Sequence, residues 1–195
     1  MSPVIYLARH GETEWNLARR YQGWGDSPLT GRGVAQAEAI GQALAAIPET
    51  AGAELAASPL GRARRTAEII GEAMRHSRPI AFDDRLKEIS LGSWDGLLRG
   101  EIEALKPGIF AGFGRYEWYF SAPGGETYDG FAGRLGAWLG ELAAGVRIVV
   151  AHGIVTRVLR GLYAGLPRET ALGLPVPQDR IWRLAGGRID EIAAG

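Results

Sequence analysis

Three short apolar runs, set far apart in the sequence, constrain the fold of this chain more than any other feature. They are Val4–Ala8 (VIYLA), residues 53–58 (AELAAS) and residues 146–153 (VRIVVAHG). Small and aliphatic residues recur at the helical period after each run, for example at Ala63, Ala67, Ile70 and Met74. Strands that alternate with helices predict an α/β fold, in which a mostly parallel sheet carries helices on its faces.

The length of the chain suits a single unit. Its 195 residues, 46% of them hydrophobic, can bury a substantial core. No repeat, low-complexity tract or interdomain linker interrupts the pattern, so we expect one domain over residues 1–195. Near the end, two short extended pieces around Gly186 and Gly187 predict a β-hairpin.

Residues 93–127 differ from the rest of the sequence because their periodicity is poor. Glycines, prolines and many aromatic residues mix here: Trp94, Phe110, Phe113, Tyr116, Trp118, Tyr119 and Phe120. Two interpretations are equally good. The segment is either a lid or cap inserted over a site, or a satellite hydrophobic cluster beneath a long loop.

Charge and composition exclude several classes of function. The 22 basic and 22 acidic residues balance, so no global positive field draws the protein to nucleic acid or to a membrane. The absence of cysteine excludes disulfides, thiolate catalysis and Cys-ligated metal sites. The apolar runs are too short for a signal peptide or a membrane span, and we expect a cytoplasmic protein. No dinucleotide-binding fingerprint is complete, so no nucleotide cofactor is expected. No sequence feature indicates an oligomeric state.

Basic residues gather at the ends of the predicted strands. Arg9 and His10 follow the first strand, Arg62 opens the helix after the second, and His152 ends the third. In open α/β sheets the ligand crevice lies outside the carboxyl ends of the strands. A helix N-terminus at Arg62 would add free N–H groups and the positive end of the helix dipole. The four residues therefore predict an anion-binding site.

A phosphoryl group is the anion that fits these residue types best. Guanidinium forks bind phosphate oxygens in pairs, which Arg9 and Arg62 could do while the phosphorus stays open to attack. Neutral histidine is a competent nucleophile near pH 7. We expect Gly11 to let the backbone approach the phosphate closely and to adopt unusual dihedral angles.

Other charged residues have a simpler interpretation. Arg64 and Arg65 are expected to be solvated or to form surface pairs, and His76 is expected at a helix end without a functional role. Arg157 lies one turn after His152, where support of the pocket and a plain surface position are equally good interpretations.

Six short sequence motifs, in this order along the chain, resemble those of a known family. They are LARHGETEWN, GWGDSPLTGRGVAQA, SPLGRARRTA, LKEISLGSWDG, PGGET and VVAHGIVTRV. From about residue 4 to about residue 163 the chain resembles the histidine phosphatase superfamily, also called phosphoglycerate mutase-like. The resemblance implies a three-layer α/β/α sandwich and a phosphohistidine mechanism without metal.

The resemblance also implies a role for individual residues. By matching position, His10 is the nucleophile, and Arg9, Arg62 and His152 bind the phosphoryl group. Glu88 is the implied proton donor to the leaving oxygen; without the resemblance, an exposed acid beside Lys87 would be the better interpretation. The pocket-lining positions implied are Asn16, Gln22 and Gly23.

Three functions compete for this site. The first is a phosphatase acting on a small phosphomonoester, the second a phosphoglycerate mutase-type isomerase, and the third a non-catalytic phosphate-binding module. The presence of His10, Glu88 and His152 together argues against the third. The word WDG is followed by LLRGEIEALKPG rather than by the acidic-basic-aromatic block of glycolytic mutases, and Gln22 resembles the phosphatase branches. We therefore predict a phosphatase, with sugar phosphates, α-ribazole phosphate and nucleoside monophosphates all open as substrates.

Overall fold

A single mixed sheet forms the centre of the molecule. The structure, a computed structural model, describes residues 3–111 and 116–194. Within these residues six strands pair in the order β3-β2-β4-β1-β5-β6. Their bounds are β1 Val4–Arg9, β2 Glu54–Ala57, β3 Ala81–Phe82, β4 Val146–Ala151, β5 Arg180–Ala185 and β6 Arg188–Ala193. Strands β1 to β4 are parallel and β5 is antiparallel to both of its neighbours, so the predicted mostly parallel sheet is confirmed.

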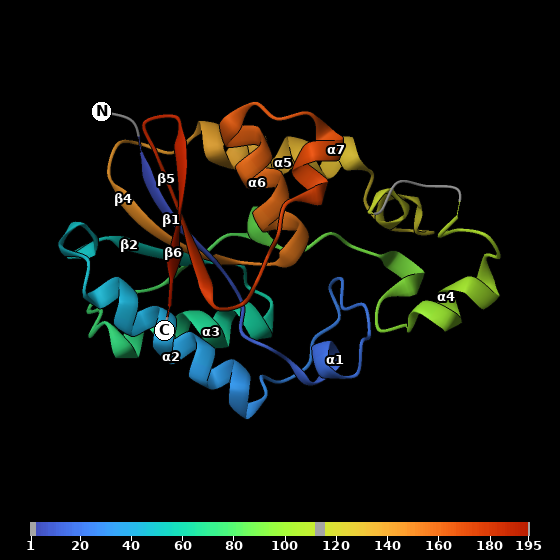
Figure 1. Ribbon diagram of the computed structural model, residues 1–195, viewed down its shortest axis with the longest axis horizontal. Coiled ribbons are helices and arrows are strands. Elements are labelled where there is room, and N and C mark those ends of the chain that lie inside the picture. The colour runs from blue at the N-terminus through green and yellow to red at the C-terminus, as the bar shows by residue number, and fades with distance from the viewer. Residues whose placement is uncertain (1–2, 112–115, 195) are drawn as a thin grey trace.

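Helices cover both faces of the sheet (Figure 1). The α-helices in the described residues are α1 Glu14–Leu17, α2 Gly31–Ala45, α3 Gly61–Ala73, α4 Arg99–Leu105, α5 Tyr128–Gly140, α6 Gly153–Ala164 and α7 Arg168–Gly173. Short 3-10 helices occur at η1 Pro48–Thr50, η2 Asp84–Leu86, η3 Gly92–Trp94 and η4 Glu117–Ser121. Figure 1 shows α2 and α3 on one side of the sheet, and α5, α6 and α7 on the other. The implied three-layer α/β/α sandwich is confirmed.

Alternation along the strands explains the two hydrophobic layers. Successive side chains of a strand point to opposite faces. On β1, Tyr6 and Ala8 pack with residues of α2 and α3, whereas Ile5 and Leu7 pack with residues of α5 and α6. Because both faces are covered, β1 is apolar along almost its whole length, as expected for a buried parallel strand.

The predicted C-terminal hairpin is present. Strands β5 and β6 pair over their full length, from Arg180 opposite Ala193 to Ala185 opposite Arg188. Gly186 and Gly187 join them with φ angles of 56° and 77°. Two consecutive left-handed residues match the twist of a tight hairpin, and glycine adopts this conformation without a steric cost.

The aromatic-rich segment packs against the α5 and α6 layer and shares its core. Trp94 and Trp118 are buried in the same core as α5 and α6. Trp118 stacks on Tyr119 with ring centroids 4.1 Å apart and meets Phe110 edge-on at 4.8 Å. Phe113 lies outside the described residues. The described part of the segment is continuous with that core, and a lid or cap at residues 93–127 of a single domain stays a prediction.

None of the helices in residues 3–111 and 116–194 combines the length and the apolar character that crossing a bilayer requires.

Candidate active site

A cavity of about 230 Å³ opens where β1 ends and α3 and α6 begin. Arginine dominates its charged lining, which in the described residues is Arg9, Arg20, Arg62, Arg157 and Glu88. His10, Asn16, Gln22 and Gly23 also line it. The structure therefore brings seven of the eight predicted site residues to one cavity, and the eighth, His152, lies directly behind His10.

His10 is fixed with one ring nitrogen available. The side chain is 2% exposed, and its Nδ1 lies 2.8 Å from the carbonyl oxygen of Gly11. Because a carbonyl only accepts, Nδ1 carries the proton in the neutral ring and donates it to Gly11. The lone pair is then on Nε2. Burial and the nearby guanidinium groups of Arg62 and Arg9 hold the pKa of His10 well below its ordinary value, which keeps the ring neutral at pH 7.

Arg62 enters the cavity from the first turn of α3. Its Nη2 donates to the carbonyl oxygen of Gly23 at 2.8 Å, and its Nη1 donates to that of Gly25 at 2.6 Å. Asp26 accepts from both the Arg62 backbone and Nη1, at 3.1 and 3.3 Å. These contacts tie the 23–26 loop to α3, and they leave the buried Nε of Arg62 without a protein partner.

Arg9 extends from the end of β1. One guanidinium nitrogen, Nη1, donates to the carbonyl oxygen of Val176 at 3.0 Å, and the buried Nε has no protein partner. Burial lowers the pKa of Arg9, and the charge of Glu88 partly opposes this shift. Two cations with unpartnered buried donors on one cavity form an environment that favours an anion.

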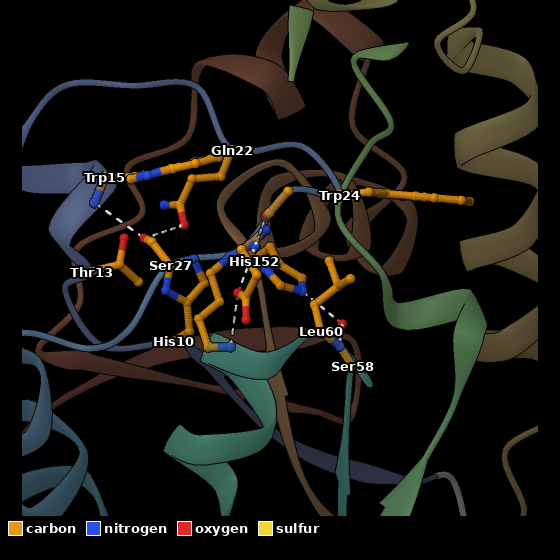
Figure 2. A network of polar contacts seen from close by, with 12 residues as sticks. His10, Thr13, Trp15, Gln22, Trp24, Ser27, Ser58, Leu60 and His152 are labelled. Atoms are coloured by element: carbon orange, nitrogen blue, oxygen red, sulfur yellow. Dashed lines mark hydrogen bonds and ion pairs between the residues drawn. The ribbon is translucent and has the colours of Figure 1, made fainter. Parts of the chain in front are cut away.

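His152 caps the N-terminus of α6 and is fully buried. Its ring centroid lies 5.2 Å from that of His10, and its Nε2 is 2.7 Å from Ser58 Oγ at the end of β2 (Figure 2). The buried Nδ1 has no protein partner. Burial, followed by the charge of Arg62, holds the pKa of His152 well below its ordinary value.

Glu88 lies at the N-terminus of α6, held by backbone N–H groups. Ile154 N donates to Oε2 at 3.2 Å, and Val155 N and Ile89 N donate to Oε1 at 3.3 and 3.1 Å. These three contacts fix the position of the carboxyl group at the helix end. From the other side, Trp24 Nε1 and Arg134 Nη2 donate to the Glu88 carbonyl oxygen at 2.7 and 3.0 Å, which fixes the loop that carries it.

The three remaining predicted residues differ in how they reach the cavity. Asn16 Oδ1 accepts from Thr13 N and from Gln178 Nε2. Gln22 is 8% exposed and accepts from Ser27 Oγ at 3.4 Å, a contact visible in Figure 2. Gly23 contributes its carbonyl oxygen, which is already bound to Arg62.

The model of the histidine phosphatase superfamily, branch 1, matches residues 5–186. The chain belongs to this superfamily. Its members are phosphatases and mutases that use a histidine nucleophile, and the site described above has the side chains that such chemistry needs.

Relatives of this chain carry names of both kinds. A protein of Salmonella paratyphi C named probable phosphoglycerate mutase GpmB is 37% identical over 198 residues, covering 96% of this chain and 83% of its own. YhfR of Bacillus stearothermophilus is 31% identical with a TM-score of 0.82, over 98% of this chain and 96% of that one. A mycobacterial glucosyl-3-phosphoglycerate phosphatase, solved with VO3, is 27% identical with a TM-score of 0.80, over 97% and 96%.

Gly11 differs from the sequence-based expectation in its backbone conformation and its contacts. Its φ is not in the left-handed region, and its N–H donates to Thr66 Oγ1 at 3.1 Å rather than facing the cavity. A Cβ on Gly11 would lie 2.3 Å from the carbonyl oxygen of Gly33. The expectation of unusual dihedral angles is wrong, because the glycine instead makes room for the first turn of α2, while a close approach to phosphate stays a prediction.

Several residues line the cavity besides the predicted ones, and for Arg157 the structure decides between the two interpretations, support of the pocket and a plain surface position. Arg157 lines the cavity and is 8% exposed, so the plain surface interpretation is wrong. Its guanidinium lies over the Tyr116 ring, 3.8 Å from the centroid. Tyr116 and Tyr119 also line the cavity and belong to the aromatic-rich segment, whereas Arg20, Tyr21 and Val176 line it from loops and had no local signal.

The remaining charged residues lie outside the cavity. Arg65 forms exposed pairs with Glu68 and Glu72, and Arg64 lies over the Phe82 ring, so the surface interpretation is confirmed. His76 follows α3 directly, near the helix end where it was expected. Within residues 3–111 and 116–194, no group of three or more His, Cys, Asp or Glu side chains could hold a metal ion.

Proposed function

We propose that this chain is a phosphatase that hydrolyses small phosphomonoesters through a phosphohistidine on His10, without a metal ion. The observation that carries the proposal is the arrangement around His10. A neutral imidazole, with its Nε2 lone pair left available by the Nδ1 contact to Gly11, shares a cavity with Arg9, Arg62 and Glu88.

In the first step, His10 Nε2 attacks phosphorus and the P–O bond to the alcohol breaks. Arg9 and Arg62 hold the phosphoryl oxygens and oppose the charge that develops on them. Glu88, in its protonated form, gives its proton to the departing alkoxide, and an alcohol leaves. Burial, followed by the charges of Arg62 and Arg9, lowers the pKa of His10 and keeps it neutral before attack, which supports its use as the nucleophile.

In the second step, water attacks the phosphohistidine. Glu88, now a carboxylate, takes a proton from that water. The P–N bond breaks, inorganic phosphate leaves, and His10 returns to its neutral form. Glu88 is therefore acid in one step and base in the next.

His152 is the proposed fourth phosphoryl ligand. If Ser58 donates to Nε2, the proton of the neutral ring is on Nδ1, the buried atom without a protein partner. A donor of this kind behind His10 suits a phosphoryl oxygen in the covalent intermediate.

The alternative is a phosphoglycerate mutase-type isomerase, which returns the phosphoryl group to another hydroxyl. It is supported by the 37% identity to a protein named probable phosphoglycerate mutase GpmB. The phosphatase proposal is supported by Gln22, by the sequence after WDG, and by the likeness to a mycobacterial phosphatase.

A single panel experiment separates the two proposals. Phosphate release is measured over sugar phosphates, α-ribazole phosphate, nucleoside monophosphates and p-nitrophenyl phosphate, with isomerisation of 3-phosphoglycerate assayed in parallel. We expect the rate of phosphate release from at least one substrate of the panel to exceed the rate of 3-phosphoglycerate isomerisation. Isomerisation of 3-phosphoglycerate faster than any release would replace the phosphatase with the mutase.

Metal independence is tested on the same panel. Exhaustive treatment with EDTA should leave phosphate release unchanged, and vanadate, which resembles the five-coordinate transition state, should inhibit. Loss of activity on chelation that is restored by zinc, manganese or magnesium would exclude the proposed metal-free mechanism.

A further inference from the structure

The segment between α7 and β5 holds two of the cavity arginines through its backbone. Three consecutive carbonyl oxygens of this segment each accept from a different arginine. Arg157 Nε donates to Leu174 O at 2.7 Å, Arg160 Nη2 to Pro175 O at 2.5 Å, and Arg9 Nη1 to Val176 O at 3.0 Å. Arg9 and Arg157 line the cavity, whereas Arg160 does not.

The same segment also reaches the nucleophile. Gln178 Nε2 donates to the carbonyl oxygen of His10 and to Asn16 Oδ1, both at 3.1 Å. Pro175 and Pro177 have fixed φ angles and no N–H, so the segment is stiff and its carbonyl groups are free to accept from side chains. Leu174–Gln178 is therefore a rigid support for Arg9 and for the backbone of His10.

Arg160 holds this support in place through its contact with Pro175 O. It is 2% exposed, its Nε donates to Thr156 O on its own helix at 3.1 Å, and its guanidinium lies 3.9 Å from the centroid of the Trp182 ring. Among the residues that the structure describes, Arg160 forms no ion pair within 4.0 Å. Burial lowers the pKa of Arg160 to about 10, so it remains charged at neutral pH.

A buried cation without an ionic partner destabilises the fold relative to an apolar side chain of similar size. A methionine would pack against Trp182 without the cost of desolvating a charge. What a methionine cannot do is donate to Pro175 O, one residue before the carbonyl group that holds Arg9. The guanidinium is explained by this contact rather than by packing.

We propose that Arg160 is a positioning residue for phosphoryl binding, which acts by fixing the Leu174–Gln178 segment and, through Val176, the guanidinium of Arg9. This inference rests on the proposed function, because Arg9 is the group that contacts the phosphoryl oxygens.

The test is a double-mutant cycle read by affinity for inorganic phosphate. Arg160→Met, Arg9→Ala and the double variant are compared with the wild type by calorimetry, together with the melting temperature of each. Arg160→Met should weaken phosphate binding about tenfold, because loss of the charged hydrogen bond from Arg160 to Pro175 O leaves Arg9 less well oriented. The melting temperature should stay the same or rise, because the variant removes a buried charge. On the Arg9→Ala background the same change should have no further effect.

Two further variants keep the test decisive. Arg160→Lys keeps the charge and a donor, so it should weaken binding only about threefold, again only when Arg9 is present. It replaces Arg160→Met in the cycle if that variant does not fold. Arg183→Met is the matched control, because Arg183 lies on β5 and pairs with Glu49 away from the cavity; it should bind phosphate as the wild type does.

Two outcomes would overturn the inference while leaving the proposed function intact. One is wild-type phosphate affinity in both Arg160 variants, and the other is an equal loss with and without Arg9. Failure of the wild type to bind phosphate and to release it from any phosphomonoester would overturn the proposed function, and the inference with it.

Discussion

The cavity has two walls that differ in how they are built. The basic wall consists of Arg9, His10 and Arg62, at the end of β1 and the start of α3. The aromatic wall consists of Tyr21, Tyr116 and Tyr119, from the loop after α1 and from the 93–127 segment. Backbone contacts fix the basic wall, whereas ring packing holds the aromatic wall together: Tyr21 meets Tyr119 edge-on at 5.8 Å.

This difference separates two tasks. Groups fixed by several backbone contacts can meet a phosphoryl group without reorganising, which is what transition-state stabilisation needs. Aromatic rings offer broad apolar surface to the rest of a substrate, and tyrosine adds a hydroxyl group. We therefore expect changes near the basic wall to affect the chemical step, and changes in the aromatic wall to affect the choice of substrate.

The largest effect is expected for Glu88→Gln, next to the basic wall. The variant keeps the shape of the side chain and removes the proton, so phosphorylation by alkyl phosphates should slow about 10²- to 10⁴-fold. p-Nitrophenolate leaves without a proton, and its phosphate ester should be affected far less. The measurement is the pre-steady-state rate of phosphohistidine formation, because loss of the base in the second step could limit steady-state turnover with both substrates.

An equal loss of that rate with both substrates would assign Glu88 a positioning role. No loss with either would remove it from the chemical step.

Arg62→Lys should have the next largest effect. Lysine keeps the charge but cannot reproduce the fork that bridges Gly23, Gly25 and the phosphoryl group, so kcat/KM should fall about 10- to 100-fold. Arg64→Lys, an exposed position on the same helix, is the control and should be neutral. A neutral result at Arg62 as well as at Arg64 would mean that Arg62 acts through its charge alone and not through its fork.

The basic wall, together with His152 behind it, should also make stability depend on pH, and the aromatic wall should not. The pKa of His10 and of His152 is lowered by folding, so the unfolded chain binds more protons below about pH 6.5. Their contribution to the free energy of unfolding is fully present above that pH and is lost as the pH falls. We expect a loss of about 1.4 kcal/mol per pH unit for each proton taken up.

Urea unfolding of the wild type and of His152→Asn at pH 5, 6 and 7 measures this slope. The variant should show a shallower decline, and the same slope in both proteins would contradict the pKa shift of His152. Burial raises the pKa of Tyr119, which is therefore silent in this range.

The smallest effect is expected in the aromatic wall. Tyr119→Leu should change kcat/KM less than about tenfold, by a factor that varies with the alcohol of the substrate, and should leave phosphate affinity unchanged. Phe120→Leu is the matched control, because Phe120 packs against Phe131 and Tyr128 and does not line the cavity. A uniform loss over all substrates would mean that this wall takes part in phosphoryl binding.

The same contrast explains what the sequence could predict. The strands, the hairpin and the gathering of Arg9, His10 and Arg62 depend on local patterns and on the rule that parallel strands end at one edge. Glu88 came only from the family resemblance, because nothing local marks a loop acid that a distant helix end will hold. Val176 and Gln178 carried no signal at all, since their contacts depend on the path of the chain between α7 and β5.

Trapping the covalent intermediate tests the proposed mechanism most directly. A rapid acid-free quench during turnover of a radiolabelled phosphomonoester should yield labelled protein whose label is stable in base and lost in acid. His10→Ala should yield none, and its turnover should fall by roughly the 10⁶-fold seen when a nucleophile is removed. Label on serine, or near-wild-type turnover by His10→Ala, would contradict a phosphohistidine at residue 10.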